Sequence, residues 1–311
     1  MANVVIQVTK DKLEEITAYY QNSIIKKPAN TLFLAKVNGT TINAYRSGKV
    51  MFQGQNAARE ANKWSESGAV TSGSANKSSV NDHGYKPPTS LFKNAHIGSD
   101  EAGTGDYFGP ITVSAVYVPD EKITILKQMG ITDSKTLTDD KIAILAKELV
   151  KEKIPYTLLT LDNTKYNKLQ KKGWNQGKMK AMLHHHAIEK LLVKIGAAPL
   201  HGILIDQFCQ PLSYRKHISS EGAKLQENVF FMTKAESYST SVAAASIIAR
   251  AKFVKEMDLL SERLGVTIPK GASSKVDETA AYLIKKHGLD VLYDNAKIHF
   301  ANTDKAMNYV R

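Results

Sequence analysis

The segment GSDEAGTGDYFGP, residues 98–110, is followed directly by the β-branched run ITVSAVYV, residues 111–118. Two adjacent carboxylates, Asp100 and Glu101, end one predicted strand, and a glycine-rich turn follows them. A dinucleotide-binding fingerprint needs a helix after its glycines, whereas this turn leads into a second strand. The segment therefore predicts a glycine-rich hairpin in an α/β domain and argues against a Rossmann-type oxidoreductase.

The glycines of this turn predict a contact with a ligand. Without a Cβ, their backbone N–H groups can approach a ligand closely. Asp100 and Glu101 beside the turn suit a hard cation that takes oxygen ligands and bridges to phosphate. The alternative is a tight hairpin with two exposed acids, which an Asp-Glu pair alone does not exclude.

Two further acids favour the metal interpretation. Asp206 ends the apolar run HGILID, residues 201–206, and Glu236 precedes the small-residue helix SVAAASIIAR, residues 241–250. Functional groups of α/β sheets gather at the carboxyl ends of strands. Four acids brought together there would repel one another without cations, and two divalent ions about 4 Å apart could hold them and clamp an in-line phosphoryl displacement.

Hydrophobic patterning divides the chain into a small N-terminal module and a larger α/β region. In the module, Asn38-Gly39 is a strong hairpin signal, and the predicted order is strand, helix, three strands, helix. The larger region is predicted to contain strands at 95–99, 111–118, 156–161 and 201–206, and helices at 141–152, 179–193, 239–257 and 279–287.

A Ser-, Gly- and Asn-rich stretch separates the two regions. Residues 64–88 read WSESGAVTSGSANKSSVNDHGYKPP and show no apolar periodicity. Such composition is typical of a flexible linker. A long surface loop within one domain is the alternative, although structureless loops of this length are uncommon in compact domains.

Basic and aromatic residues interleave in the N-terminal module. Tyr45 and Arg46 end one predicted strand, Lys49 lies in the next turn, and Phe52 follows. This pattern suits a sheet face that lies on a sugar-phosphate backbone. Equally, Tyr45 and Phe52 could be core residues and the charges merely solvated.

Composition restricts the class of protein. The 311 residues carry a net charge of +12, which points to a polyanionic partner, most commonly nucleic acid. A single cysteine, Cys209, excludes an intrachain disulfide and any multi-cysteine metal site. We find neither a run of about 20 apolar residues nor a signal-peptide pattern, and we expect a cytoplasmic protein with no membrane association.

The tract His184-His185-His186 has the composition of a metal site but lies in a predicted helix. Adjacent helical residues point in different directions, so the three imidazoles are not expected to converge on one ion.

The chain resembles the ribonuclease HIII family, a bacterial relative of ribonuclease HII. The resemblance rests on four segments in the same order along the chain: GSDEAGTGDYFGPI (98–111), TDSKTLTDDKI (132–142), ILIDQF (203–208) and TKAESYSTSVAAASIIARA (233–251). Thr104 between the glycines, where ribonuclease HII relatives carry arginine, and Glu236, where they usually carry aspartate, place the chain on the HIII side.

The resemblance implies a ribonuclease H-like α/β catalytic domain (residues 91–311), a flexible linker (67–90) and a TATA-binding-protein-like α+β substrate-binding domain (1–66). It implies that Asp100, Glu101, Asp206 and Glu236 are catalytic carboxylates that bind Mg²⁺ or Mn²⁺, with two ions when substrate is bound. The family cleaves the RNA strand of RNA–DNA hybrids and leaves 3′-hydroxyl and 5′-phosphate ends. We expect a monomer with no obligate protein partner.

Residues for substrate contact follow from the same resemblance. The Gly103-Thr104-Gly105 backbone is expected to read 2′-hydroxyls, the group that distinguishes RNA from DNA. Ser134, Lys135 and Lys270 are candidate backbone contacts, and Tyr45, Arg46 and Lys49 would add sequence-independent affinity.

Two rival functions remain open. One is incision at single ribonucleotides embedded in DNA, as ribonuclease HII performs, with the same carboxylates. The other is a nucleic-acid-binding protein with an inactive site, which the four intact acids argue against.

Overall fold

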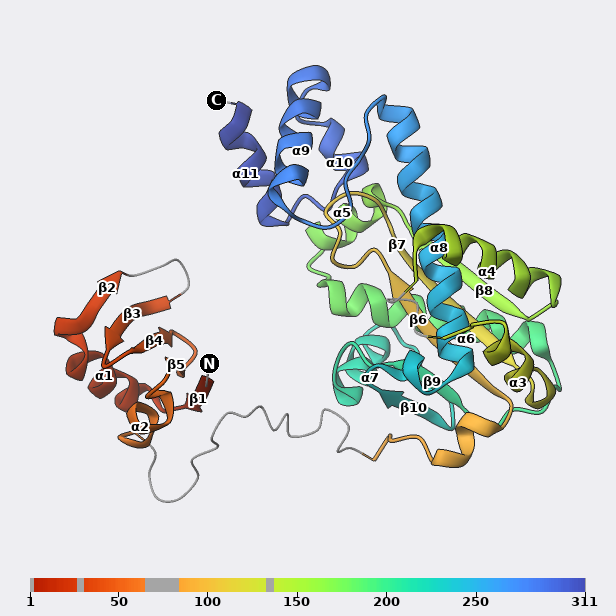
Figure 1. Ribbon diagram of the computed structural model, residues 1–311, viewed down its shortest axis with the longest axis horizontal. Coiled ribbons are helices and arrows are strands. Elements are labelled where there is room, and N and C mark those ends of the chain that lie inside the picture. Colours follow the sequence, from red (N-terminus) through yellow and green to blue (C-terminus); the bar gives the residue numbers. More distant parts are fainter. Residues whose placement is uncertain (1–2, 27–30, 65–83, 133–136, 311) are drawn as a thin grey trace. The chain divides into compact units, whose positions relative to one another are not determined.

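The computed structural model describes residues 3–26, 31–64, 84–132 and 137–310. The chain divides into two compact units, Met1–Ser79 and Val80–Arg311, which are described separately below (Figure 1). Residues 65–83, most of the predicted linker, lie outside the described residues, so the division at residues 66 and 91 stays a prediction.

The N-terminal unit is a five-stranded antiparallel sheet with helices on one face. The strand order is β1-β5-β4-β3-β2. Asn38 and Gly39 both have positive φ, as the predicted two-residue hairpin between β3 and β4 requires. Its elements are β1 (Asn3–Gln7), α1 (Lys10–Tyr19), a 3₁₀ turn (Gln21–Ser23), β2 (Ile24–Lys26), β3 (Thr31–Val37), β4 (Thr40–Tyr45), β5 (Lys49–Gly54) and α2 (Ala57–Asn62).

Alternation along the strands gives this sheet a core face and an outer face. Phe33, Ile42 and Phe52 are fully buried with residues of α1 and α2, so Phe52 is a core residue and not part of a binding face. On the opposite side of the sheet, Asn43 pairs with Met51, and both are half-buried. The short strand β2 was not predicted.

The second unit is built on a mixed five-stranded sheet, ordered β10-β9-β6-β7-β8. β9 pairs in parallel with both β6 and β10, whereas β7 pairs antiparallel with both β6 and β8. The strands are β6 (His96–Ala102), β7 (Ile111–Val118), β8 (Tyr156–Leu161), β9 (Ile203–Asp206) and β10 (Val229–Met232). The segment that follows the glycine-rich turn is therefore a strand, as predicted.

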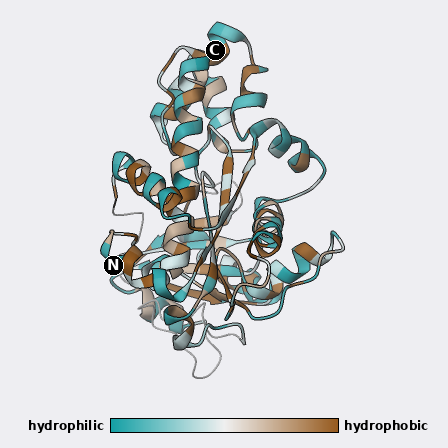
Figure 2. Ribbon diagram, turned by 90° about the vertical axis from the view of Figure 1, so that its right-hand side faces the viewer, coloured by the Kyte–Doolittle hydropathy of each residue, from teal (hydrophilic) through white to brown (hydrophobic). Residues whose placement is uncertain are grey.

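Helices cover both faces of this sheet, and hydrophobic residues concentrate in the strands and on the helix faces that meet them (Figure 2). One core forms between the sheet and α6, next to which α7 packs. The other forms between β7 and helices α3, α4 and α8. The helices are α3 (Asp120–Gln128), α4 (Asp139–Lys151), α5 (Asn163–Lys171), α6 (Gln176–Ile195), α7 (Pro211–Ser219), α8 (Thr240–Leu264), α9 (Ser274–His287), α10 (Val291–Asn295) and α11 (Ala301–Val310), with 3₁₀ turns at Thr89–Lys93 and Ala235–Ser237.

The small residues of α8 allow it to lie unusually close to β6. A Cβ on Gly98 would stand 2.2 Å from the backbone nitrogen of Val242, so only glycine fits at this crossing. The side chain of Ser239 caps α8 by accepting the N–H of Val242, and its hydroxyl lies 2.6 Å from His96 Nε2 at the start of β6. The start of α8 is thereby fixed to the strand that carries Asp100.

The C-terminal helices form a third hydrophobic cluster with the end of α8 and the segment before β7. Tyr107 and Phe108 are fully buried in it. Lys297 is also fully buried, and its Nζ donates to the carbonyl oxygens of Asp106 and Gly109, each at 2.7 Å. The end of the chain thus holds the glycine-rich turn.

Tyr85, near the end of the predicted linker, contacts residues of the second unit. Tyr85 packs edge-on against Phe231, its hydroxyl accepts a hydrogen bond from Arg215, and its carbonyl accepts the N–H of Phe231. A short 3₁₀ turn then buries Leu91. Apolar side chains spaced too sparsely for a periodic pattern attach this stretch to the second unit.

The predicted α/β fold class is confirmed. Among the helices of the described residues, none combines the length and apolar character that crossing a bilayer requires.

Candidate active site

Two strands of the central sheet deliver three of the predicted acids to one cleft. Asp100 and Glu101 lie near the end of β6, and Asp206 ends β9. Because β6 and β9 run parallel, their carboxyl ends lie at the same edge of the sheet. All three acids line a cleft of about 480 Å³, together with Gly103, Thr104, Gly105, Asp106, Asp139, Ser246, Arg250 and Lys270.

Burial and the neighbouring acids raise the pKa of Asp100. Its carboxylate is 6% exposed and accepts the N–H of Glu101 at 2.7 Å. Burial raises its pKa well above the ordinary value, and the charges of Asp206 and Glu101 raise it further. Hydrogen bonds from Ser246 and from the Glu101 backbone only partly oppose this rise. The carboxylate of Asp100 therefore lies where its negative charge is least favourable without a compensating cation.

Glu101 has basic partners that the sequence did not indicate. Lys180 Nζ donates to Glu101 Oε1 at 2.8 Å, and His184 Nε2 donates to Oε2 at 2.8 Å. Burial alone would raise the pKa of Glu101, but the hydrogen bond and charge of His184, and then those of Lys180, lower it to about 2. Both residues lie on α6, so this helix fixes the orientation of the Glu101 carboxylate.

The three histidines of the tract have different partners in the structure. His184 is fully buried, stacks on Phe208, and its Nδ1 lies 2.7 Å from Ser99 Oγ. The expectation that the three imidazoles diverge holds for His184. It does not hold for His185 and His186, which both face Glu189.

Glu236 lies beside Asp206 but does not line the cleft. It occupies the 3₁₀ turn before α8 and is 3% exposed. Its neighbour Ala235 donates its N–H to Asp206 Oδ1 at 2.9 Å, which places this turn at the end of β9. The structure therefore brings Asp100, Glu101 and Asp206 into one cleft, and Glu236 lies in the turn that contacts Asp206.

The glycine-rich turn forms one wall of the cleft. Gly103 has a φ of +83°, and a Cβ there would stand 2.2 Å from the Pro110 oxygen, so glycine is required. The carbonyl of Thr104 accepts a hydrogen bond from Gln176 at 2.9 Å. Gly105 is exposed, and a Cβ there would meet no atom within 4 Å, so its backbone is open to a ligand.

The cleft also carries a cluster of charges. Arg250 on α8 donates to Asp139 Oδ1 at 2.9 Å, and Lys270 pairs with the other oxygen of Asp139. Lys270 was predicted as a substrate contact, and the structure places it in the cleft. Asp139 and Arg250 were not predicted.

The remaining predicted contacts lie elsewhere. Ser134 and Lys135 are outside the described residues. Tyr45, Arg46 and Lys49 belong to the N-terminal unit, where Tyr45 is half-buried and the two basic residues are exposed.

The acids of this cleft have the donor set of a divalent cation site. Carboxylate oxygens are the ligands that Mg²⁺ and Mn²⁺ prefer in proteins. The burial of Asp100 beside Asp206 and Glu101 supplies the uncompensated negative charge that such an ion would neutralise. The residues therefore fit divalent metal ions.

Comparison with known proteins identifies the family. Residues 97–303 match the family model described as Ribonuclease HII, and residues 3–77 match a domain of unknown function (DUF3378). Ribonuclease HIII of Oceanobacillus iheyensis is 54% identical over 98% of this chain and 99% of its own, and Ribonuclease HIII of Bacillus cereus is 48% identical over 99% of each.

Solved structures agree with this assignment. The crystal structure of Bst-RNase HIII in complex with Mn²⁺ is 42% identical, covers 99% of both chains and superposes with a TM-score of 0.70. The crystal structure of a mutant of Bst-RNase HIII is 41% identical over the same share of each chain, also with a TM-score of 0.70. The chain is therefore an endoribonuclease of the ribonuclease H type, and it belongs to the ribonuclease HIII family.

Proposed function

We propose that the chain hydrolyses the RNA strand of RNA–DNA hybrids at the cleft between β6 and β9, leaving 3′-hydroxyl and 5′-phosphate ends. Asp100, Glu101, Asp206 and Glu236 are the proposed catalytic carboxylates, and they would hold two ions of Mg²⁺ or Mn²⁺ when substrate is bound. The observation that carries this proposal is the meeting of Asp100, Glu101 and Asp206 in one cleft at the ends of two parallel strands.

Each carboxylate has a distinct setting. Asp100 is buried between the charges of Asp206 and Glu101, which suits it to bridge two cations. Glu101 is oriented by Lys180 and His184. Bound divalent ions would lower the pKa of the attacking water and stabilise the leaving 3′-oxygen.

Recognition of the hybrid is assigned to the walls of the cleft. The exposed backbone at Gly105, in the turn of Gly103 and Thr104, can approach the minor groove and contact 2′-hydroxyls. Lys270 lines the same cleft, where a phosphate could replace Asp139 as its partner.

The N-terminal unit would add affinity that does not depend on sequence. The exposed side chains of Arg46 and Lys49 are suited to phosphate contacts beside Tyr45. The double variant Arg46→Ala/Lys49→Ala should raise KM for a hybrid several-fold and flatten its salt dependence, with kcat unchanged. An unaltered KM would contradict a role for this surface.

The proposal is tested by metal-dependent cleavage of two labelled duplexes side by side. One is a continuous RNA–DNA hybrid, and the other is DNA with a single ribonucleotide. We expect cutting of the hybrid, with 3′-hydroxyl and 5′-phosphate products, and loss of cutting in Asp100→Asn. Mass spectrometry of the fragments identifies the ends, and sedimentation of the free chain tests the proposed monomer.

Other outcomes would redirect the assignment. Efficient incision at the single ribonucleotide would favour the ribonuclease HII-like activity, against which Thr104 between the two glycines argues. Full activity of Asp100→Asn would contradict the assignment of the metal site to these carboxylates. Tight hybrid binding without any cutting would indicate a binding protein.

A further inference from the structure

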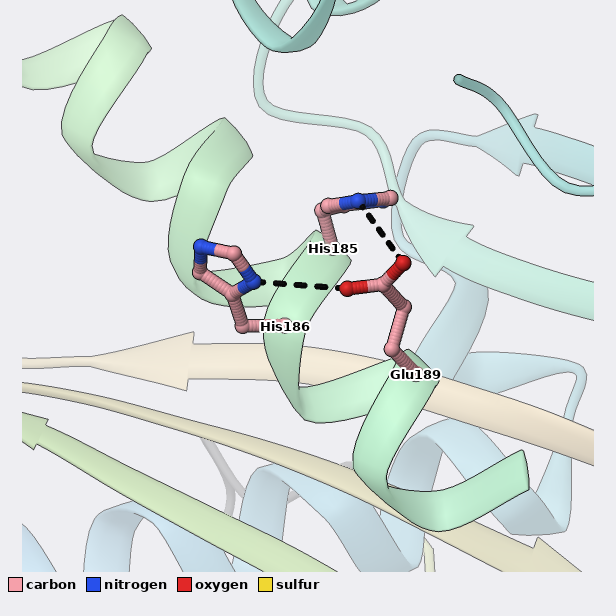
Figure 3. Close-up of side chains that lie close together, drawn as sticks. All are labelled: His185, His186 and Glu189. Atoms are coloured by element: carbon pink, nitrogen blue, oxygen red, sulfur yellow. Dashed lines mark hydrogen bonds and ion pairs between the residues drawn. The ribbon is translucent and has the colours of Figure 1, made fainter. Parts of the chain in front are cut away.

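A second cluster of potential metal ligands lies on α6, apart from the catalytic cleft. His185, His186 and Glu189 each offer one ligand atom, and these three atoms lie within 4.8 Å of one another. Figure 3 shows the two imidazole rings approaching the same carboxylate from two sides. Within the described part of the chain, this is the one group of three or more His, Cys, Asp or Glu residues with that spacing.

Helical geometry explains the convergence. Glu189 lies three residues after His186 and four after His185, which are the spacings at which helical side chains meet. His185 Nε2 stands 3.2 Å from Glu189 Oε1, and His186 Nδ1 stands 3.4 Å from Oε2. The carboxylate therefore brings together two neighbouring imidazoles that would otherwise diverge.

The separations are of the size found between ligands of one ion. Ligand atoms at 2.0–2.1 Å from a tetrahedral zinc ion are separated by about 3.3 Å, and each imidazole of the cluster lies at a similar distance from one of the two oxygens of Glu189. The His186 side chain is 52% exposed, which leaves its ring room to turn toward a shared ion. Glu189 is 43% exposed, which leaves the remaining coordination positions to water.

The donor set differs in kind from that of the catalytic cleft. The cleft offers carboxylate oxygens, which suit Mg²⁺ and Mn²⁺, whereas two imidazoles and one carboxylate suit Zn²⁺, Co²⁺, Ni²⁺ or Cu²⁺. His185 is buried, so one ligand is already held in place before an ion arrives. The preceding residue, His184, faces Glu101 instead, so the cluster and the cleft use different residues of α6.

We propose that His185, His186 and Glu189 form a second metal site, which binds one divalent transition ion of the zinc class and does not supply the ions of the catalytic cleft.

Zinc binding to the untagged full-length chain tests this proposal. The chain is stripped with a chelator and titrated with Zn²⁺ against a chromophoric zinc indicator, in excess Mg²⁺ to occupy the catalytic carboxylates. His186→Ala and Glu189→Gln alter exposed side chains, so the fold should persist. His287→Ala, which alters an exposed histidine on α9, is the matched control.

We expect the wild-type chain and His287→Ala to bind one Zn²⁺ with equal affinity, and both cluster variants to bind it at least 10-fold more weakly. Co²⁺ should give visible absorption bands that are lost in the same two variants. Equal binding in all four chains would overturn the proposal, as would the absence of zinc binding. Loss of zinc binding in Asp100→Asn but not in His186→Ala would assign the ion to the cleft and would also overturn it.

Discussion

Replacing the buried Lys297 should change how the stability of the catalytic unit depends on pH. The amine is fully buried and donates to the carbonyls of Asp106 and Gly109. Burial lowers its pKa from 10.5 to about 7, against an opposing effect of the Asp106 charge. A neutral amine still has two N–H donors, so both hydrogen bonds persist when the proton is lost.

The direction of this pH dependence follows from the number of protons that the folded and the unfolded chain bind. Between about pH 7 and 10.5 the unfolded chain binds more protons at Lys297 than the folded chain, so stability rises with pH across this interval. Below pH 7 Lys297 is protonated in both the folded and the unfolded chain, so the full cost of burying its charge lowers the stability of the fold. From pH 7 to pH 9 the free energy of unfolding should rise by about 2 kcal/mol from this group.

The variant Lys297→Met removes the titrating group and both donors. Its deficit in stability relative to the wild-type chain should therefore widen by about 2 kcal/mol between pH 7 and pH 9. Urea unfolding followed by Trp174 fluorescence, in a Trp64→Phe background, reports the catalytic unit. In the control Lys285→Met, which alters an exposed residue of α9, the difference from wild type should be the same at both pH values. A stability deficit of Lys297→Met that does not vary with pH would show that the lowered pKa of Lys297 does not contribute to stability.

Three further substitutions test other parts of the structure. Asp100→Asn removes one of several mutually repelling buried acids, so it should raise the melting temperature in chelator and abolish stabilisation by Mn²⁺. An unchanged melting curve would contradict this. Gly98→Ala places a Cβ 2.2 Å from Val242 N and should cost about 3 kcal/mol in urea unfolding. Its control Gly105→Ala has open space and should stay within about 0.5 kcal/mol of wild type. Glu60→Ala removes a buried acceptor and should destabilise the N-terminal unit by about 1–3 kcal/mol, measured by its thermal unfolding.

Local patterns were sufficient to predict much of the fold. The β-branched run 111–118 forms β7 with the predicted bounds, and the Asn38-Gly39 turn forms the predicted hairpin. The helices α3, α5, α7, α10 and α11 and the strand β10 were missed. β10 has only four residues, too few to establish a periodicity, and α7 begins at a proline that reads as a turn.

Only part of the candidate site could be predicted, because a local sequence pattern marks some of its residues and not others. Asp206 ends an apolar run, and Asp100 lies between a predicted strand and the glycine-rich turn, so local patterns mark both. Lys180 and His184 lie about eighty residues from Glu101 in sequence, and only the packing of α6 against the sheet brings them to it. Asp139 looks like an ordinary first-turn acid of a helix, and its partners depend on where α8 lies.

The parallel pairing of β6 and β9 also determines at what point of translation the catalytic unit can fold. Ile97 pairs with Ile203, so the two partners leave the ribosome more than a hundred residues apart. Hairpins such as β3–β4 join neighbouring segments, and the N-terminal unit can fold while the rest of the chain is still being made. An incomplete chain that carries Asp100 and Glu101 has neither Asp206 nor the α8 crossing at Gly98. The N-terminal unit can therefore fold first, and the proposed active site is complete only after α8 has been made.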